Sequence, residues 1–340
     1  MRILVIGAGS IGRRHISNLN SLGYNEIDVV DIDEERLNYI KENFKIRNTS
    51  NDFLKPLENN KYDVAFVLTP PSSHIPIAIE LAKRGIDLFI EKPISANLEG
   101  INELLELKKK NNLIIMVGYN QRFNIGIKEI KQILNEGKLG KIYYIRAEVG
   151  QYLPDWRPWQ DYRESYTSIK ELGGGILLDG SHEIDYVLWL INREVEDIMG
   201  LSNKVSNMET DVEDVAEIIF WFDDGSIGSI HLDMLNRKYT RYVKIIGENG
   251  SVQYDFKSKI LEYYNINSNY IFKKIYEDYD INQTYVDEIK HFFSSRELRK
   301  EPLASLAESI RVLSAILKIK ESTINNQEKK ARKGLNAKCT

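Results

Sequence analysis

The feature that most constrains the fold is a glycine-rich turn near the N-terminus. The run Gly7-Ala8-Gly9-Ser10-Ile11-Gly12 follows an apolar segment, Arg2–Ile6, and opens a helix-like pattern. Glycines at this spacing allow a tight turn, close approach of a pyrophosphate, and close packing of helix on strand. The helix N-terminus then offers unpaired N–H groups to the phosphates. The expected cofactor contacts in this turn are Gly7, Gly9, Ser10, Ile11 and Gly12.

A carboxylate ends the second predicted strand, Ile27–Asp31. Asp31 lies 19 residues after Gly12, where an acidic side chain accepts hydrogen bonds from the adenosine ribose hydroxyls and repels a 2′-phosphate. No Arg or Ser follows Asp31 directly, so the sequence favours NAD over NADP. Three alternatives stay open: a glycine-rich turn without a ligand, a turn that binds the methyl-donor cofactor of a methyltransferase, and Asp31 as the N-cap of a helix at Glu34.

Strand-like and helix-like segments alternate over roughly the first 120 residues. This alternation predicts an α/β domain with a parallel sheet and right-handed crossovers. The expected strands are short apolar runs, typical of strands covered on both faces: Arg2–Ile6, Ile27–Asp31, Val64–Leu68, Ile86–Ile90 and Leu113–Val117.

The pattern changes after about residue 122. Asp224-Gly225 and Asn249-Gly250 each separate two strand-like runs and predict tight hairpins in a β-meander. We predict residues 1–122 as an NAD-binding domain, 123–324 as a substrate-binding and oligomerisation domain, and 325–340 as a polar, basic, frayed tail. The other elements expected here are helices near Ile125–Leu134, Gly175–Ile191, Thr284–Ser295 and Leu303–Ser322, and a strand near Ile142–Val149.

Composition narrows the partners of the chain. Its 340 residues have a formal net charge of −4, which gives no general attraction to nucleic acid or an anionic membrane. No apolar run approaches the roughly 18 residues of a membrane span. Cys339 is the single cysteine, so no internal disulfide can form, and a reducing, cytoplasmic location is expected.

Four further motifs, taken in order along the chain, suggest a known family. They are Thr69-Pro70-Pro71-Ser72-Ser73-His74, Glu91-Lys92-Pro93, Gly118-Tyr119-Asn120-Gln121-Arg122-Phe123 and the run from Gly173 to Asp185, GGGILLDGSHEID. With the glycine turn, this set resembles the glucose–fructose oxidoreductase and inositol dehydrogenase family of NAD(P)-dependent sugar oxidoreductases. The resemblance is specific over residues 1–123, good over 168–191, weak over 302–316 and loose across the meander.

The resemblance implies a Rossmann domain followed by an α/β domain with a large, mostly antiparallel open sheet. It also implies homodimers or homotetramers built through that sheet. Lys92 is expected to reach the oxygen on the reacting carbon, with Asp179 and His182 beside the nicotinamide. In many members the aspartate and the histidine are four residues apart, whereas Asp179 and His182 are three apart, which leaves the exact role of Asp179 open. The remaining expected cofactor contacts are Thr69, Pro70, His74, Glu91, Lys92 and Asn120.

The same residues have a chemistry of their own. Lys92 follows an apolar strand at the carboxyl edge of the predicted sheet, where open α/β folds bind ligands, and Pro93 could follow a cis bond. A lysine near a positive nicotinamide would have a lowered pKa and could help deprotonate a hydroxyl, and His182 has an ordinary pKa near neutrality. The alternatives are a solvated lysine, a buried histidine capping a helix, and a metal site; with no second His/Cys cluster, we predict no metal.

The irregular aromatic stretch Gln151–Thr167 is the expected substrate wall. Tyr152 and Trp156 offer flat faces to a sugar, while Arg157 and Arg163 offer forked donors to a carboxylate or phosphate. Arg122 and Asp185 are further candidate substrate contacts. The alternative is a scaffold loop in which Asp155, Asp161 and Glu164 pair with the arginines.

We predict an NAD-dependent oxidoreductase that transfers a hydride between the nicotinamide and a hydroxyl or keto group of a sugar, cyclitol or sugar derivative, with an anionic substrate as one option. Lys92 and His182 handle the proton and Asp179 supports them. Two alternatives stay open: a non-catalytic dinucleotide-sensing regulator, and an enzyme whose bound NAD cycles without net redox.

Overall fold

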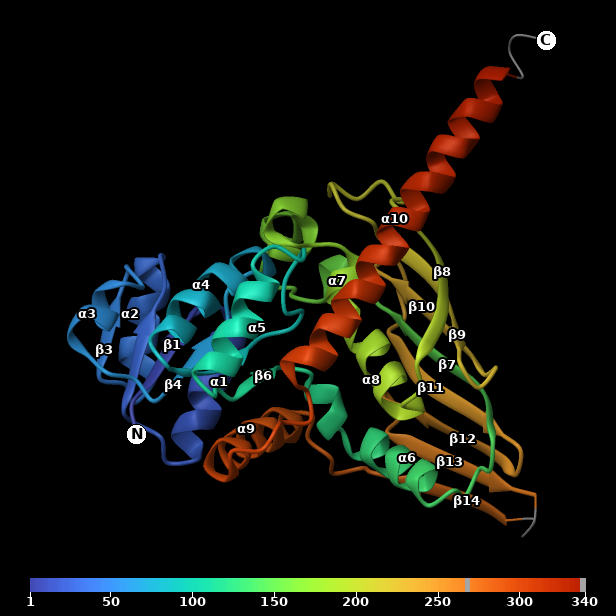
Figure 1. The fold of residues 1–340 in the computed structure, drawn as a ribbon, viewed down its shortest axis with the longest axis horizontal. Coiled ribbons are helices and arrows are strands. Elements are labelled where there is room, and N and C mark those ends of the chain that lie inside the picture. The colour runs from blue at the N-terminus through green and yellow to red at the C-terminus, as the bar shows by residue number, and fades with distance from the viewer. Residues whose placement is uncertain (267–269, 337–340) are drawn as a thin grey trace. The chain divides into compact units, whose positions relative to one another are not determined.

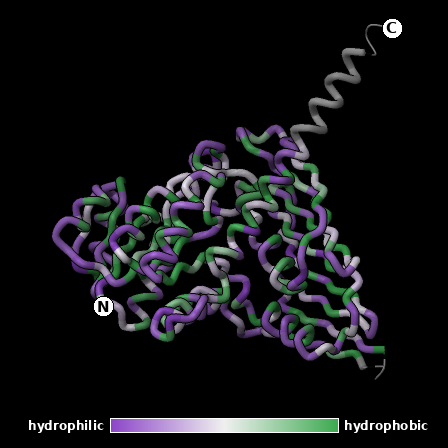
Figure 2. The backbone as a smooth tube through the Cα atoms, viewed as in Figure 1, coloured by the Kyte–Doolittle hydropathy of each residue, from purple (hydrophilic) through white to green (hydrophobic). Residues whose placement is uncertain are grey.

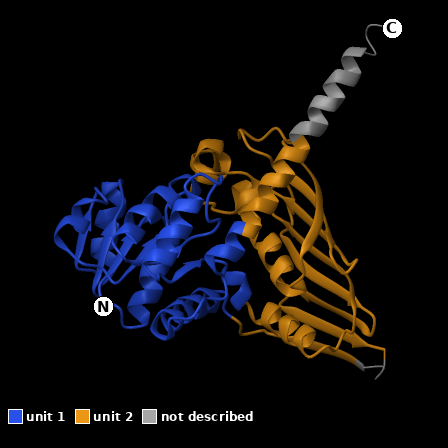
Figure 3. Ribbon diagram, in the orientation of Figure 1, with its two compact units in different colours: residues 1–123, 280–310 blue, residues 124–279, 311–340 orange. Residues whose placement is uncertain are grey.

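The computed structural model describes residues 1–266 and 270–336, and these divide into two compact units (Figure 3). Unit 1 comprises residues 1–123 and 280–310, and unit 2 comprises residues 124–279 and those from 311 onward. The sequence predicts one continuous second domain from 123, whereas residues 280–310 group with the N-terminal unit. The reason is aromatic packing, because the Phe292 ring meets those of Phe66 and Phe89 edge-on, with centroids 5.8 Å apart in both pairs.

Unit 1 is built on a parallel sheet with the strand order β3-β2-β1-β4-β5-β6 in the described residues (Figure 1). Its central strands are fully buried, and Figure 2 shows hydrophobic residues along them. The strands are β1 (Ile3–Ile6), β2 (Ile27–Val30), β3 (Asn48–Ser50), β4 (Val64–Val67), β5 (Asp87–Ile90) and β6 (Ile115–Val117). The helices are α1 (Ser10–Ser21), α2 (Glu34–Asn43), α3 (Lys55–Asn59), α4 (Pro71–Lys83), α5 (Ile101–Lys110) and α9 (Asn282–Leu298), with a 3₁₀ turn, η1 (Asn120–Phe123).

The edge strand β3 and the short helix α3 are absent from the sequence prediction. The residues of β3 are polar and partly exposed, and the strand pairs with β2 alone. An edge strand without a buried face carries no apolar alternation, so periodicity cannot detect it.

Unit 2 is built on an eight-stranded sheet with the order β14-β13-β12-β11-β7-β10-β9-β8 in the described residues. Only β7 and β10 run parallel, which confirms the expected mostly antiparallel sheet. Both predicted hairpins are present, with Gly225 at φ +81° and Gly250 at φ +150°. The strands are β7 (Ile142–Gly150), β8 (Val195–Asn203), β9 (Val215–Phe222), β10 (Ile227–Asp233), β11 (Thr240–Gly247), β12 (Gly250–Asp255), β13 (Ile260–Asn265) and β14 (Tyr270–Ile275); β8, β13 and β14 are not in the sequence prediction.

Helices cover one face of this sheet (Figure 1). They are α6 (Ile125–Asn135), α7 (Ile176–Asp179), α8 (Ser181–Ile191) and the part of α10 (Leu306–Asn336) that belongs to unit 2. The missing side chain of Gly200 on β8 admits Ile319, because a Cβ there would lie 2.7 Å from that side chain. The helix α10 continues to Asn336, where the sequence predicts a frayed tail, because Gln, Glu, Lys, Ala and Arg prolong a helix well. Residues 337–340 lie outside the described residues. No described helix is long and apolar enough to span a bilayer.

The other face of the sheet carries a histidine held between two carboxylates. His231 Nδ1 lies 2.6 Å from Glu217 Oε1 on β9, and its Nε2 lies 3.0 Å from Asp233 Oδ2. The hydrogen bond to Asp233, followed by that to Glu217, raises the pKa of His231 from 6.5 to about 9.

This raised pKa predicts a loss of stability in alkaline solution. The protonated ring stabilises the folded state fully below pH 6.5, and the contribution disappears as pH rises through about 9. Urea unfolding between pH 7 and 10 should therefore show a steeper fall in the free energy of unfolding for the parent protein than for His231→Gln. Equal slopes in the two proteins would contradict this assignment.

Candidate active site

The candidate site in unit 1 is the edge where the parallel strands end. The chain runs outward from β1 to β3, returns to β4 beside β1, and continues outward through β6. The order therefore reverses between β1 and β4, and the crevice at such a reversal is where open α/β sheets bind ligands. Because the strands are parallel, the loops that follow them lie along one edge. Those loops carry the predicted cofactor residues Gly7 to Gly12, Asp31, Thr69, Pro70, Glu91, Lys92 and Asn120.

The glycine turn has the shape that a pyrophosphate needs. Gly7 has φ +107°, and a Cβ there would lie 2.5 Å from the Leu68 carbonyl oxygen. A Cβ on Gly12 would lie 2.1 Å from the carbonyl oxygen of Gly7. A Cβ on Gly9 would meet nothing within 4 Å, so this position faces open space. Among the described residues no side chain caps α1, which begins at Ser10 and Ile11, so its first N–H groups are available to phosphate oxygens.

Asp31 is tied directly to the glycine turn. Its Oδ2 accepts the Ala8 N–H at 2.6 Å and its Oδ1 accepts the Asp33 N–H at 2.9 Å. Each carboxylate oxygen has a second lone pair, so the group can still accept ribose hydroxyls. The alternative of Asp31 as N-cap is wrong, because Asp33 caps α2 by accepting from the N–H groups of Glu35 and Arg36.

Two neighbours of Asp31 escaped the sequence analysis. Ile32 is 90% exposed, so its side chain offers an apolar surface beside the Asp31 carboxylate on which a planar ring of a ligand could pack. Arg36, one turn into α2, brings its Nη1 to 3.8 Å from Asp31 Oδ2. The signal for Ile32 is an apolar residue directly after a strand-end carboxylate; that for Arg36 appears only once the helix start is known.

His74 joins two loops of the site. Its Nε2 lies 2.7 Å from the Thr69 carbonyl oxygen and its Nδ1 lies 2.9 Å from that of Pro93. The ring is fully buried, and burial lowers the pKa of His74. Both nitrogens face backbone oxygens, so the geometry makes His74 a link between the loops after β4 and β5 and does not support the expected direct cofactor contact.

The loop after β5 presents Lys92. The Lys92–Pro93 bond is cis, as the sequence allows. Glu91, 7% exposed, accepts the Lys92 N–H through Oε2 at 2.7 Å. Gly118 leaves space for this carboxylate, since a Cβ there would lie 3.0 Å from the same oxygen. Glu91 thus holds the start of the Lys92 turn.

Asn120 and Arg122 contact the returning segment of unit 1. Asn120 Nδ2 donates to Thr284 Oγ1 at 2.7 Å. Arg122, 2% exposed, donates to the Leu303 carbonyl oxygen and to Glu308 Oε2, the latter at 3.0 Å. These contacts give Arg122 a structural role, and they do not support its expected contact with substrate.

Unit 2 holds the second group of predicted residues. Asp179 ends α7 and His182 lies in the first turn of α8, with Gly180 between the two helices. Asp179 Oδ1 accepts the Tyr166 hydroxyl at 3.1 Å and Oδ2 accepts that of Thr167 at 2.7 Å. The aromatic stretch therefore lies against Asp179, as its position in the sequence suggests.

The buried face of α8 is fixed by an ion pair. Glu183 Oε1 accepts Arg241 Nε at 2.7 Å and the Tyr186 hydroxyl at 3.3 Å. Burial, followed by the charge of Glu183, raises the pKa of Tyr186. Asp185 on the same helix is fully buried. Glu183 is turned toward Arg241 on β11. Among the described residues, no three His, Cys, Asp or Glu side chains are arranged so that they could hold a metal ion.

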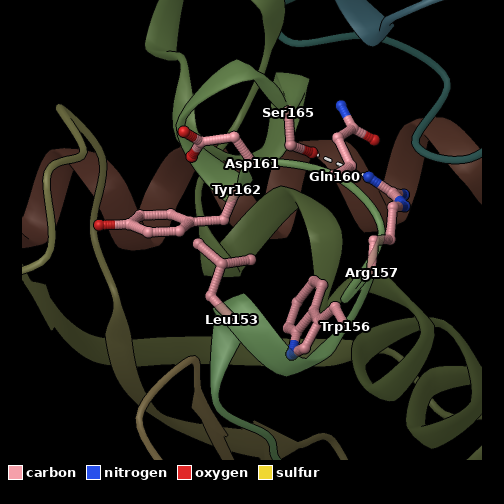
Figure 4. A pocket seen from close by; sticks show the side chains of 7 residues that line it. All are labelled: Leu153, Trp156, Arg157, Gln160, Asp161, Tyr162 and Ser165. Carbon is pink, nitrogen blue, oxygen red and sulfur yellow. Dashed lines mark hydrogen bonds between the residues drawn. The ribbon is translucent and has the colours of Figure 1, made fainter.

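The loop of residues 151–168 closes on itself. The pocket whose lining side chains are drawn in Figure 4 has a volume of about 10 Å³, which is space for about one water molecule and not for a sugar. Arg157 Nη1 donates to Ser165 Oγ at 2.8 Å, while Arg163 pairs with Asp161 at 2.6 Å and with Glu209 at 3.2 Å. The pocket is lined by Leu153, Trp156, Arg157, Gln160, Asp161, Tyr162 and Ser165.

These contacts favour the scaffold alternative for Arg163, whose guanidinium is occupied by carboxylates. The two aromatic candidates, Trp156 and Tyr152, also contact other residues of unit 2. Trp156 Nε1 donates to the Gln151 carbonyl oxygen at 3.0 Å, and the Arg237 guanidinium lies 3.4 Å from the Tyr152 ring centroid.

Known proteins match both units. A family model described as an oxidoreductase family with an NAD-binding Rossmann fold, GFO/IDH/MocA, matches residues 1–119, and the GFO/IDH/MocA C-terminal domain matches residues 127–253. Myo-inositol 2-dehydrogenase of Thermotoga maritima is 27% identical over 324 residues, covering 90% of this chain and 91% of that protein. The scyllo-inositol 2-dehydrogenase (NAD(+)) of Bacillus subtilis is 28% identical over 262 residues, covering 74% and 73%.

A solved structure shows the same fold. Levoglucosan dehydrogenase in complex with NADH and levoglucosan superposes with a TM-score of 0.86 over 96% of this chain and 97% of that one. The two sequences are 19% identical.

Proposed function

This chain belongs to the GFO/IDH/MocA family of oxidoreductases, with an NAD-binding Rossmann domain, and we propose that it interconverts a hydroxyl and a keto group on a sugar, cyclitol or sugar derivative. The names of the two inositol dehydrogenases and of levoglucosan dehydrogenase support this class of substrate.

One observation carries the proposal: a single sheet edge holds both a dinucleotide cradle and a lysine. The cradle is the glycine turn with Asp31 bonded to it at 2.6 Å, and Lys92 follows β5, the second strand from β1 on the other side of the reversal. A regulator that only senses a dinucleotide needs the cradle but no proton acceptor. The combination therefore favours an enzyme.

Each residue has a proposed task. Bound NAD supplies the hydride acceptor, and the protein supplies position and proton transfer. Lys92 hydrogen-bonds the reacting hydroxyl, and His182 takes up its proton. Asp179, already fixed by Tyr166 and Thr167, supports His182.

The open sheet face of unit 2 is the proposed surface for a second copy of the chain. Neighbouring strands place large apolar side chains there in register, with Met199 opposite Ile219. Met199, Leu201, Ile219 and Trp221 are 55%, 57%, 38% and 38% exposed. Exposed apolar surface of this kind is typical of an interface.

The reaction is tested by following NADH absorbance with inositols, neutral sugars, sugar acids and nucleotide sugars. We expect NADH formation with at least one polyol and none after its reacting hydroxyl is removed. Substrate conversion without net NADH would indicate a bound cofactor that cycles. Binding of NAD without any conversion would favour the regulator.

Cofactor choice is a separate prediction. We expect NAD to bind more tightly than NADP, because the Asp31 carboxylate faces the place of the extra phosphate. Asp31→Ser should narrow the difference in calorimetry, while Asp52→Ser, on an exposed loop, serves as the control. Equal affinity of the parent protein for the two dinucleotides would contradict the role of Asp31.

A further inference from the structure

A cluster of ionisable side chains is enclosed within unit 1 beside the Lys92 turn. His15 on α1 and Glu288 on α9 are fully buried, and Glu91 is 7% exposed. The cluster joins segments far apart in sequence, since α9 belongs to the returning segment of unit 1. Aromatic rings surround His15, with centroids at 5.1 Å for Phe89 and 5.9 Å for both Phe66 and Tyr285.

In the described part of the chain, His15 and Glu288 are buried in this cluster without direct hydrogen bonds to their side-chain polar atoms. Within the described residues, neither ring nitrogen of His15 nor either carboxyl oxygen of Glu288 has a hydrogen-bond partner. His15 Nε2 lies 3.6 Å from Glu91 Oε1. Buried polar groups without partners are rare in native proteins and call for an explanation.

Burial opposes ionisation of the Glu288 carboxyl group. Burial, and then the negative charge of Glu91, raise the pKa of Glu288 well above its ordinary range. Tyr285, one turn earlier on α9, responds to the same field, because burial and then Glu91 raise its pKa, while Arg14 and Lys92 lower it. The Arg14 guanidinium from α1 lies 4.6 Å from the Tyr285 ring centroid. Glu91 is thus the charged group that acts on Glu288, while Arg14 and Lys92 act on its helix neighbour Tyr285.

We propose that His15 is a positioning residue that holds the Glu91 carboxylate in the orientation in which it binds the Lys92 backbone, and that the buried Glu288 supports this arrangement only while it is protonated. One carboxylate oxygen of Glu91 accepts the Lys92 N–H at 2.7 Å, and the other faces His15. An uncharged Glu288 leaves this arrangement undisturbed, whereas a charged one would repel Glu91. The proposal rests on the proposed role of Lys92 in proton transfer.

Three variants and one control test the proposal in the full-length protein. Glu288→Gln copies the shape and neutrality of the acid, Glu288→Ala removes the group, and His15→Phe keeps the ring but removes both nitrogens. Lys290→Gln changes an exposed residue of the same helix and is the control. Each is assayed for kcat, for the KM of NAD, and for both as a function of pH.

We expect the kcat of the parent protein to fall at alkaline pH as Glu288 ionises, and Glu288→Gln to lack this fall while matching the parent at neutral pH within about twofold. His15→Phe should lower kcat roughly tenfold, the effect of losing about one interaction with a charged group, with the KM of NAD nearly unchanged. An identical alkaline limb in Glu288→Gln, or an unchanged kcat in His15→Phe, would overturn the positioning role.

Two readouts do not depend on turnover. A buried acid with a raised pKa stabilises the fold fully below its ordinary pKa of 4.5, and this stabilisation is lost as pH rises. The free energy of unfolding of the parent should thus fall relative to that of Glu288→Gln as pH rises from 5. If this free energy depends on pH in the same way in both proteins, Glu288 is not held in its protonated form.

The rate at which acetic anhydride labels Lys92, measured by mass spectrometry, reports the position of this side chain. Glu288→Ala and His15→Phe should change the rate severalfold, and Glu288→Gln and Lys290→Gln should not. If no sugar is turned over, the proposed function fails, and this labelling then decides the positioning role alone. Equal rates in all five proteins would refute it.

Discussion

Replacing Lys92 with alanine should lower turnover by roughly 10²–10⁴, the range for losing a positioned acid–base group, while NAD affinity changes by a few-fold at most. The two effects are expected to separate because the proposed dinucleotide contacts, the glycine turn and Asp31, lie on other loops of the sheet edge than Lys92. Steady-state kinetics and calorimetry on the same preparation measure the two effects.

Controls make this result specific to the proton path. Lys83→Ala, at the partly exposed end of α4, removes a lysine from the same unit and should leave turnover unchanged. His182→Ala should be impaired to a similar degree, and the double variant should lose less than the product of the two single losses if both residues serve one path. Near-parent turnover in Lys92→Ala would remove Lys92 from the mechanism.

Removing Arg241 should destabilise unit 2 by about 3–5 kcal/mol, as expected when one partner of a buried ion pair is left alone. The side chains of Glu183 and Arg241 are 1% and 13% exposed, and Arg241 Nε lies 2.7 Å from Glu183 Oε1. Arg241→Ala leaves the Glu183 carboxylate buried without its cation. Urea unfolding at neutral pH measures the loss.

A matched pair of variants separates charge burial from simple loss of packing. Glu183→Leu with Arg241→Met removes both charges and should recover much of the stability lost by Arg241→Ala. Arg311→Ala breaks an ion pair with Glu194 whose side chains are 49% and 78% exposed, and it should have little effect. If Arg241→Ala is as stable as Arg311→Ala, the buried pair does not fix α8.

The two predictions bear on the two groups of candidate residues. Lys92 depends on a loop held by Glu91 and His74 in unit 1. His182 lies on α8, whose buried face is tied to β11 through Glu183. In each unit a buried charged or polar residue holds the segment that carries a candidate residue.

Local sequence was sufficient for most elements of the first 123 residues. Buried parallel strands read as short apolar runs, and the glycine turn needs particular residues at particular spacings, so both leave a mark on the sequence. The hairpins at Asp224-Gly225 and Asn249-Gly250 were predictable for the same reason, because positive φ angles select glycine. The edge strands β3, β8 and β14 were not, because an edge strand needs little apolar alternation.

The roles of charged residues were decided by distant contacts. Arg122 and Arg163 have the composition of anion-binding residues, yet Glu308 holds the first and Asp161 and Glu209 hold the second. Glu288 lies in a sequence that reads as an ordinary amphipathic helix, yet it is fully buried and under the influence of the charge of Glu91, which follows β5.

The sequence by itself determined the dinucleotide cradle, its carboxylate and the alternation that makes a parallel sheet, because these depend on steric and hydrophobic patterns within a few residues. Only the tertiary structure decided that residues 280–310 return to the N-terminal unit, and that His15, Glu91 and Glu288 share one buried space. Burial and the charge of a neighbour set the protonation of a carboxyl group, and both depend on which distant segments the fold brings together.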